Sequence, residues 1–141
     1  MIVVAGVDDS PMSVAVANRA IEEARWRGDV VHLVHVTHLQ YIATDVPVNW
    51  EQVAEAERIS VWAGLAEVID ASDVPIERVD LDGYPADALV THASAVDASL
   101  LVVGTRGRGE FASLILGSTS HRAIHLAQCD VLVVKPSVET G

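Results

Sequence analysis

Short apolar runs alternate along the chain with longer segments in which apolar residues recur every three or four positions. The four most apolar runs lie at Ile2–Val7, Val30–Val36, Leu100–Val103 and Val131–Val134. Continuous apolar runs of this length predict strands that are buried on both faces of a parallel sheet. The run Ile76–Leu81 carries charged residues and therefore predicts a strand at the edge of that sheet.

Four helices are predicted between these runs. In the first, Ser10 would be the N-cap, Pro11 the first helical residue and Gly28 the residue that ends the helix. The other three begin near Asn49, at Pro85 and after Gly117-Ser118. The buried face predicted for the second helix consists of apolar residues at helical spacing: Val53, Ala56, Ile59, Ala63, Ala66 and Ile69.

This alternation predicts a single α/β domain with a mostly parallel sheet and helices on both of its faces. We expect the domain to cover residues 1–136 and residues 137–141 to form a flexible tail. The 141 residues are 50% hydrophobic, which suffices for one core. No apolar run is long enough to span a membrane, and the first residues lack the features of a signal peptide. With one cysteine, Cys129, these features favour a cytoplasmic protein without disulfides.

The charge balance narrows the range of ligands. The chain has 20 acidic and 9 basic residues, a net charge of −11, which disfavours binding to nucleic acid or to an anionic membrane. Lys135, the only lysine, is followed by Pro136, so the chain has no Walker A loop. A phosphate group would have to be bound by glycine-loop amides and a helix N-terminus, with an arginine as a further candidate.

Such a combination follows the fourth predicted strand, where Gly104-x-x-Gly107 precedes Gly117-Ser118 by nine residues. Glycines let the backbone approach a ligand closely, and the helix beginning here adds about half a positive charge at its N-terminus. Arg106 is placed to clamp phosphate oxygens, as is Arg108.

Ligands of open parallel sheets bind beyond the carboxyl ends of the strands, where the winding direction reverses. The end of the first strand is therefore the second place to search, and it reads Val7-Asp8-Asp9-Ser10. Each feature also has a simpler interpretation. The glycines could serve merely to form turns. Ser118 could serve merely as the cap of the fourth helix, and Asp8 merely as a cap of the first helix.

The segment with Gly104-x-x-Gly107, nine further residues and Gly117-Ser118 resembles the nucleotide-binding signature of the universal stress protein family. Val7-Asp8-x-Ser10, His35-Val36 and Gly83-x-Pro85-Ala86 also resemble that family, and the resemblance extends from about Ile2 to Pro136. It implies a Rossmann-like sheet of five parallel strands in the order 3-2-1-4-5, with four helices. It also implies a homodimer formed largely through the last strand.

The family resemblance further implies a regulatory module of the stress response that binds ATP, with Mg²⁺ bound through the phosphates. Some family members bind cyclic AMP instead. The phosphates would lie on Gly104, Gly107, Gly117 and Ser118, and Asp8 would contact the adenosine end, with Gly6 and Val36 near the base. Thr119 and Arg106 are added to this site because of their positions in the sequence.

Two residues depart from the family pattern. Asp9 stands where the family usually has glycine, and it could repel a triphosphate, help hold Mg²⁺ or remain solvated. Asp130 stands where the family favours proline. The segment around Phe111 and Leu114 is apolar, and it could pack on the domain, cover the pocket or contact a second copy.

The sequence favours a binding protein over an enzyme, because it has neither a Ser-His-Asp order nor a GxSxG elbow. An interaction module without nucleotide and a slow ATPase remain as alternatives. We expect no dedicated metal site. His35 should face the opposite side of its strand from His32 and His38. His121 and His125 are four residues apart, but the residues between them do not form an HExxH motif.

Overall fold

The computed structural model describes residues 1–38, 47–105 and 117–136. Within these residues, strands and helices alternate, as predicted. The elements are β1 (Ile2–Val7), α1 (Met12–Arg27), β2 (Val30–Thr37), α2 (Trp50–Asp70), β3 (Ile76–Asp82), α3 (Pro85–Ala95), β4 (Leu100–Gly104), α4 (Ser118–Leu126) and β5 (Asp130–Val134).

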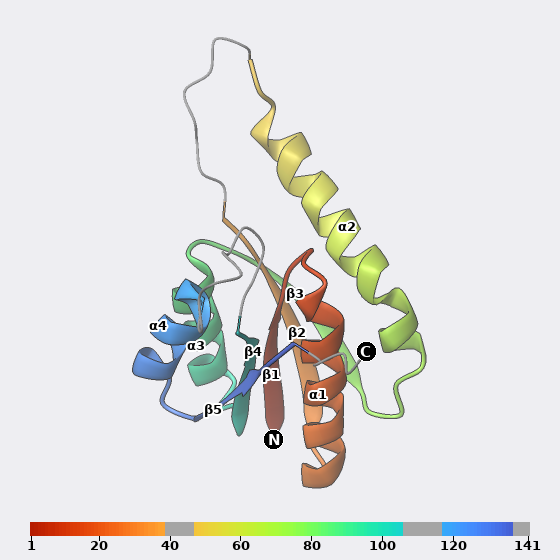
Figure 1. The fold of residues 1–141 in the computed structure, drawn as a ribbon, viewed down its shortest axis with the longest axis vertical. Helices are drawn as coiled ribbons and strands as arrows, with labels where there is room; N and C mark the ends of the chain where they lie inside the picture. Colours follow the sequence, from red (N-terminus) through yellow and green to blue (C-terminus); the bar gives the residue numbers. More distant parts are fainter. Residues whose placement is uncertain (39–46, 106–116, 137–141) are drawn as a thin grey trace.

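The strands form one parallel sheet in the order β3-β2-β1-β4-β5, which confirms the predicted fold. The chain winds from β1 through β2 to β3 on one side, then returns to build β4 and β5 on the other (Figure 1). The winding direction therefore reverses between β1 and β4, and a crevice at their carboxyl ends is the expected ligand site. The charged strand β3 lies at an edge, also as predicted.

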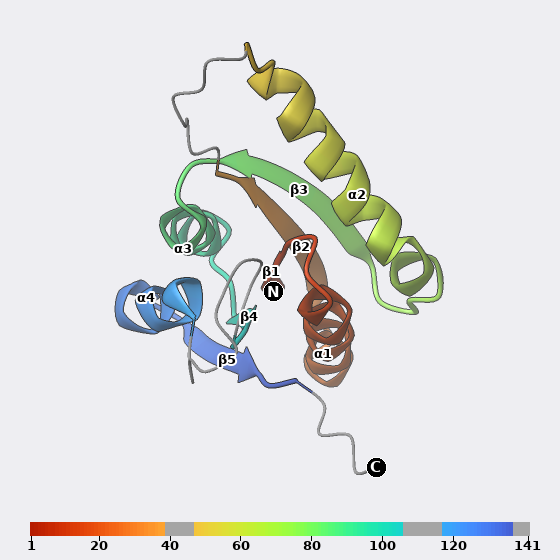
Figure 2. The same cartoon turned by 45° about the horizontal axis from the view of Figure 1, so that its top comes forward.

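Helices cover both faces of the sheet. α1 and α2 lie on one face, and α3 and α4 lie on the other (Figure 2). Alternate residues of β1 point to opposite faces, so Val3 packs in the core beneath α1 while Val4 packs beneath α3. Burying each such side chain contributes roughly 1.5–3 kcal/mol to the stability of the sheet that carries the site.

The start of α1 differs from the prediction, whereas its end agrees with it. Gly28 ends the helix in the left-handed conformation, with φ of 69°. Ser10 does not cap the helix, because Pro11 occupies the N-cap position and makes no side-chain capping bond. The carboxylate of Asp8 accepts a hydrogen bond from the Ser10 N–H instead, and this local turn delays the first helical residue to Met12.

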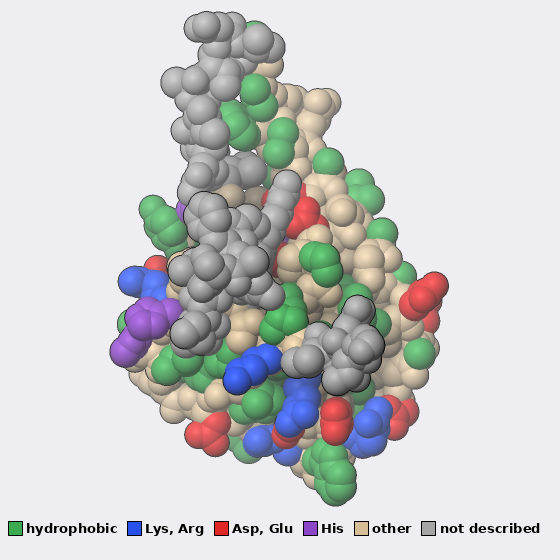
Figure 3. All heavy atoms as spheres, in the orientation of Figure 1, with side chains coloured by type: hydrophobic (Ala, Val, Ile, Leu, Met, Phe, Trp, Pro, Cys, Tyr) green, Lys and Arg blue, Asp and Glu red, His purple; other side chains and the backbone are tan. Residues whose placement is uncertain are grey.

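The predicted buried face of α2 is wrong except for Ile69, which packs against the core. Ala54, Val61 and Leu65 are buried, while the side chains of Val53 and Ile59 are 43% and 61% exposed. Apolar residues occur around most of this helix, so their spacing did not identify the buried face. The larger side chains fill the space against α1 and the sheet, and hydrophobic side chains remain visible along the outer side of α2 (Figure 3). No described helix is long and apolar enough to cross a membrane.

Candidate functional site

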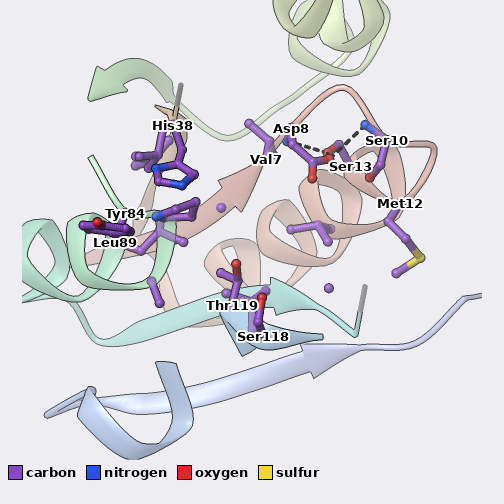
Figure 4. Close-up of a pocket in the computed structure, with 18 of the residues that line it drawn as sticks. Val7, Asp8, Ser10, Met12, Ser13, His38, Tyr84, Leu89, Ser118 and Thr119 are labelled. Carbon is purple, nitrogen blue, oxygen red and sulfur yellow. Dashed lines mark hydrogen bonds between the residues drawn. The ribbon is translucent and has the colours of Figure 1, made fainter. Parts of the chain in front are cut away.

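A cavity of about 830 Å³ opens beyond the carboxyl ends of β1, β2 and β4. Helix N-termini surround it, and Figure 4 shows side chains from both halves of the sheet facing this space. The lining residues include Gly6, Asp8, Ser10, Met12, Ser13, Val34, Val36, His38, Val53, Glu57, Tyr84, Asp87, Leu89, Val103, Gly104, Ser118, Thr119 and Arg122.

The wall formed by β1 and α1 is held by a closed set of hydrogen bonds. The Asp8 N–H donates to Ser13 Oγ at 2.7 Å, and the Ser13 hydroxyl donates to Asp8 Oδ1 at 3.0 Å. The same carboxylate oxygen accepts from the Ser10 N–H at 2.9 Å (Figure 4). Asp8 therefore fixes the turn before α1 without capping the helix, and it lines the cavity.

The floor of the cavity is apolar and tightly packed. Val34 and Val36 of β2 and Val103 of β4 contribute to it. A Cβ atom at Gly6 would lie 2.7 Å from Leu89 Cδ1, so the absence of a side chain lets α3 approach β1 closely. A side chain at this position would have to displace the Leu89 side chain, whether or not a ligand is bound.

The wall formed by α3 and α4 carries an ion pair. Arg122 Nε lies 3.0 Å from Asp87 Oδ1, and Arg122 Nη2 lies 3.5 Å from Asp87 Oδ2. Ser118 and Thr119 form the first turn of α4 beside this pair. The N-terminus of α4 therefore points into the cavity and favours an anion there.

The rim and the back of the cavity add polar and aromatic groups. The rings of His38 and Tyr84 lie 4.9 Å apart, tilted by 39°, and both residues line the opening. Glu57 of α2 faces the cavity, and its Oε1 lies 3.5 Å from Nε2 of the buried His35. On its other side, His35 Nδ1 lies 3.3 Å from Asp80 Oδ1 of β3.

The structure brings most of the predicted site residues together. Those that line the cavity are Gly6, Asp8, Val36, Gly104, Ser118 and Thr119. Gly117 is buried outside this lining, and its N–H donates a hydrogen bond to the Thr105 carbonyl. It is the N-cap of α4, so Ser118 is the first helical residue and not the cap. Arg106, Gly107 and Arg108 lie outside the described residues, as do Phe111 and Leu114.

Several lining residues were missed by the sequence analysis. Asp87 and Arg122 are separated by 35 positions, so no local pattern joins them. Arg122 had a signal that was overlooked, because it lies four residues after Ser118 and therefore on the same side of α4. His38 and Tyr84 follow the ends of neighbouring strands, and their meeting depends on the register of β2 and β3.

Other candidate groups lie away from the cavity. His32 faces α3, where its Nδ1 lies 3.0 Å from Nε2 of His92, while His35 faces α2, so the predicted alternation is confirmed for these two residues. His38 lies beyond the end of β2. No group of three or more potential metal ligands occurs among the described residues. Asp9 is not part of the cavity lining. Burial raises the pKa of the Cys129 thiol.

Comparison with known proteins identifies the class. The model of the universal stress protein family matches residues 1–135, and the chain belongs to this family. It is 34% identical over 139 residues to universal stress protein A homolog 1 of Coxiella burnetii, covering 94% of each chain. A universal stress protein of Mycobacterium tuberculosis is 32% identical over 141 residues, which are 96% of this chain and 45% of that protein. The chain thus spans about half the length of the mycobacterial relatives.

Solved structures show the same fold. Universal stress protein UspA of Lactobacillus plantarum superposes with a TM-score of 0.84 at 18% identity, over 95% of this chain and 97% of that one. A universal stress protein in complex with cAMP has a TM-score of 0.69 at 28% identity, over 97% and 98% of the two chains. The Archaeoglobus fulgidus protein in complex with dAMP has a TM-score of 0.73 at 27% identity, over 96% and 98%.

Proposed function

We propose that the chain binds an adenine nucleotide, ATP in particular, in this cavity and acts as a regulatory nucleotide-binding module in stress response. One observation supports this most directly. The N-terminus of α4 opens into a cavity of about 830 Å³ at the point where the strand order reverses. This volume lies in the range of small-molecule sites, and adenine nucleotides are bound by the two family structures compared above.

The residues present fit such a ligand. Val34 and Val36 offer an apolar surface to a base, and Ser118 and Thr119 begin the helix whose dipole favours phosphate. Among the described residues that line the cavity, Ser10 Oγ is buried without a hydrogen-bond partner. Buried hydroxyls without partners are costly unless a ligand or water satisfies them.

We propose that Mg²⁺ accompanies ATP. The described lining carries the carboxylates of Asp8, Glu57 and Asp87 against the single guanidinium of Arg122. A triphosphate would add further negative charge to this acidic site. A cation bound through the phosphate oxygens would offset part of that repulsion, because hard cations bind carboxylate and phosphate oxygens together.

We also propose that two copies pair through β5. This strand forms the edge of the sheet opposite β3, and the side chains of Val131 and Val133 are partly exposed there. An uncovered apolar edge strand favours pairing with another strand. Sedimentation that shows a monomer at micromolar concentration would contradict this part of the proposal.

Calorimetric titration with ATP and with adenosine tests the nucleotide site. Ser118→Glu places a carboxylate on the first turn of α4, where the helix tolerates it but phosphate is repelled. We expect this variant to lose at least about tenfold in ATP affinity, or roughly 1.4 kcal/mol, and much less in adenosine affinity. Gln128→Glu, which adds the same charge beyond the other end of α4, should bind like the parent.

The two titrations separate the alternatives. Equal ATP affinity for the parent and Ser118→Glu would refute the placement of the phosphates. A folded parent chain that binds neither compound would instead favour an interaction module without nucleotide. Release of phosphate over many turnovers would favour an ATPase.

A further inference from the structure

The ion pair between Asp87 and Arg122 lines the same cavity as Ser118, where the proposed function puts phosphate. Ser118 and Arg122 are four residues apart on α4, so their side chains lie on one side of the helix. Side chains in a helix lean toward its N-terminus, which carries the Arg122 side chain back toward the first turn. Both residues line the cavity.

Asp87 holds this guanidinium from the neighbouring helix. It lies in the first turn of α3 and contacts Arg122 through both of its carboxylate oxygens, at 3.0 and 3.5 Å. The side chains are 42% and 60% exposed, respectively. Exposed pairs of this kind stabilise a protein only slightly, because water screens their attraction. The Arg122 side chain can therefore exchange partners at little cost.

Arg122 is also the only arginine or lysine in the described part of the lining. A phosphate group that enters beside α4 has one cationic side chain within this wall, and that side chain is already paired with a carboxylate. Arginine binds phosphate with two parallel N–H···O bonds, a geometry that matches its present contact with Asp87.

We propose that Arg122 selects phosphorylated nucleotides, and that Asp87 holds it until a phosphate group takes its place. This inference rests on the proposed nucleotide site and assigns a role to two residues within it. Binding exchanges the Arg122–Asp87 pair for an Arg122–phosphate pair. Asp87 therefore lowers the affinity for phosphorylated ligands, and Arg122 raises it, whereas adenosine is affected by neither residue.

The experiment is a double-mutant cycle measured by calorimetric titration with ATP and adenosine. We expect Arg122→Gln to lower the ATP affinity by about tenfold and Asp87→Asn to raise it by about threefold. In the Arg122→Gln background, Asp87→Asn should have almost no effect, because its benefit comes from releasing the guanidinium. Adenosine affinity should stay within about twofold throughout.

Asp73→Asn is the matched control. Asp73 forms a similar two-oxygen contact with Arg25, at 2.7 and 2.9 Å, and neither residue lines the cavity. Its removal should leave both affinities unchanged. The melting temperature of every variant, measured without ligand, shows whether the fold is intact. Arg122→Lys keeps the charge without the forked geometry and should fall between the parent and Arg122→Gln.

Each contrary outcome has a distinct meaning. Parental ATP affinity in a folded Arg122→Gln variant would overturn the role of Arg122. An equal gain from Asp87→Asn with and without Arg122 would show that Asp87 acts only through its own charge, and this would overturn the exchange. If the parent binds adenosine but does not discriminate ATP from it, the inference fails and the nucleotide site stands. If the parent binds neither compound, both proposals fail.

Discussion

The two walls of the cavity are built by different kinds of interaction. On the β1–α1 side, Asp8 and Ser13 close a ring of hydrogen bonds at 2.7 and 3.0 Å, between residues five positions apart and partly buried. On the α3–α4 side, an exposed pair between Asp87 and Arg122 joins two helices whose residues are 35 positions apart. The first wall is fixed locally, whereas the second is held by a contact that solvent and ligands can replace.

This difference assigns different roles to the two walls of the cavity. Hydrogen bonds shielded from water cost more to break than exposed ion pairs. The β1–α1 wall therefore defines the shape of the cavity, and the α3–α4 wall can respond to what enters it. Substitutions that weaken either wall should show this contrast in stability as well as in binding.

The largest effect is expected where the two walls meet. Gly6→Val would bring a side chain against Leu89, whose Cδ1 lies 2.7 Å from the position of an added Cβ. We expect a loss of about 3 kcal/mol in the free energy of unfolding, since the added side chain must displace the buried Leu89 side chain. Urea unfolding measures this loss. In a Leu89→Ala background, the same substitution should cost much less, and strict additivity would rule out the steric explanation.

The two acidic residues of the walls give the next contrast. Asp8→Ala leaves the Ser10 N–H and the Ser13 hydroxyl without their acceptor, so we expect a loss of about 2 kcal/mol in the free energy of unfolding. Asp87→Ala should cost less than about 1 kcal/mol, because it removes an exposed ion pair. Chemical denaturation distinguishes the two values. Asp8→Asn keeps an acceptor oxygen and should recover most of the loss; similar costs at both positions would contradict the contrast.

The smallest effect concerns the pH dependence of stability that arises from His92 in the last turn of α3. Burial and the neighbouring His32 lower the pKa of His92. The unfolded chain then binds this proton more readily than the folded one, so stability falls as the pH drops below the unfolded value of about 6.5. The contribution is constant above that pH. Melting temperatures between pH 7.5 and pH 5 should fall less steeply in His92→Gln than in the parent.

Thr91→Gln is the control for this titration, since Thr91 lies exposed on α3 beside His92 and carries no titratable group, so this change should leave the pH dependence of the parent unchanged. An identical decline in His92→Gln and the parent would show that the contact between His32 and His92 does not sense protonation.

Much of the fold could be predicted from the sequence, because its signals are local. The valine runs marked the buried strands, and the charges of Ile76–Leu81 marked an edge. The α2 face could not be predicted, since apolar residues surround that helix and only the shape of the facing surface selects Val61 and Leu65. The site divides in the same way. Asp8 stood in a recognisable motif, whereas the pairing of Asp87 with Arg122 depends on how two helices pack.

One hydrogen bond near the site bears on how the protein can be engineered. The Gly117 N–H donates to the Thr105 carbonyl, and Ser120 Oγ donates to the same oxygen at 3.4 Å. The residues that flank segment 106–116 are thus joined by contacts that do not involve the segment itself. Closing a longer chain between fixed ends costs only about 0.6 kcal/mol for each doubling of its length. A fluorescent reporter domain inserted between Thr105 and Gly117 should therefore leave the sheet and α4 folded.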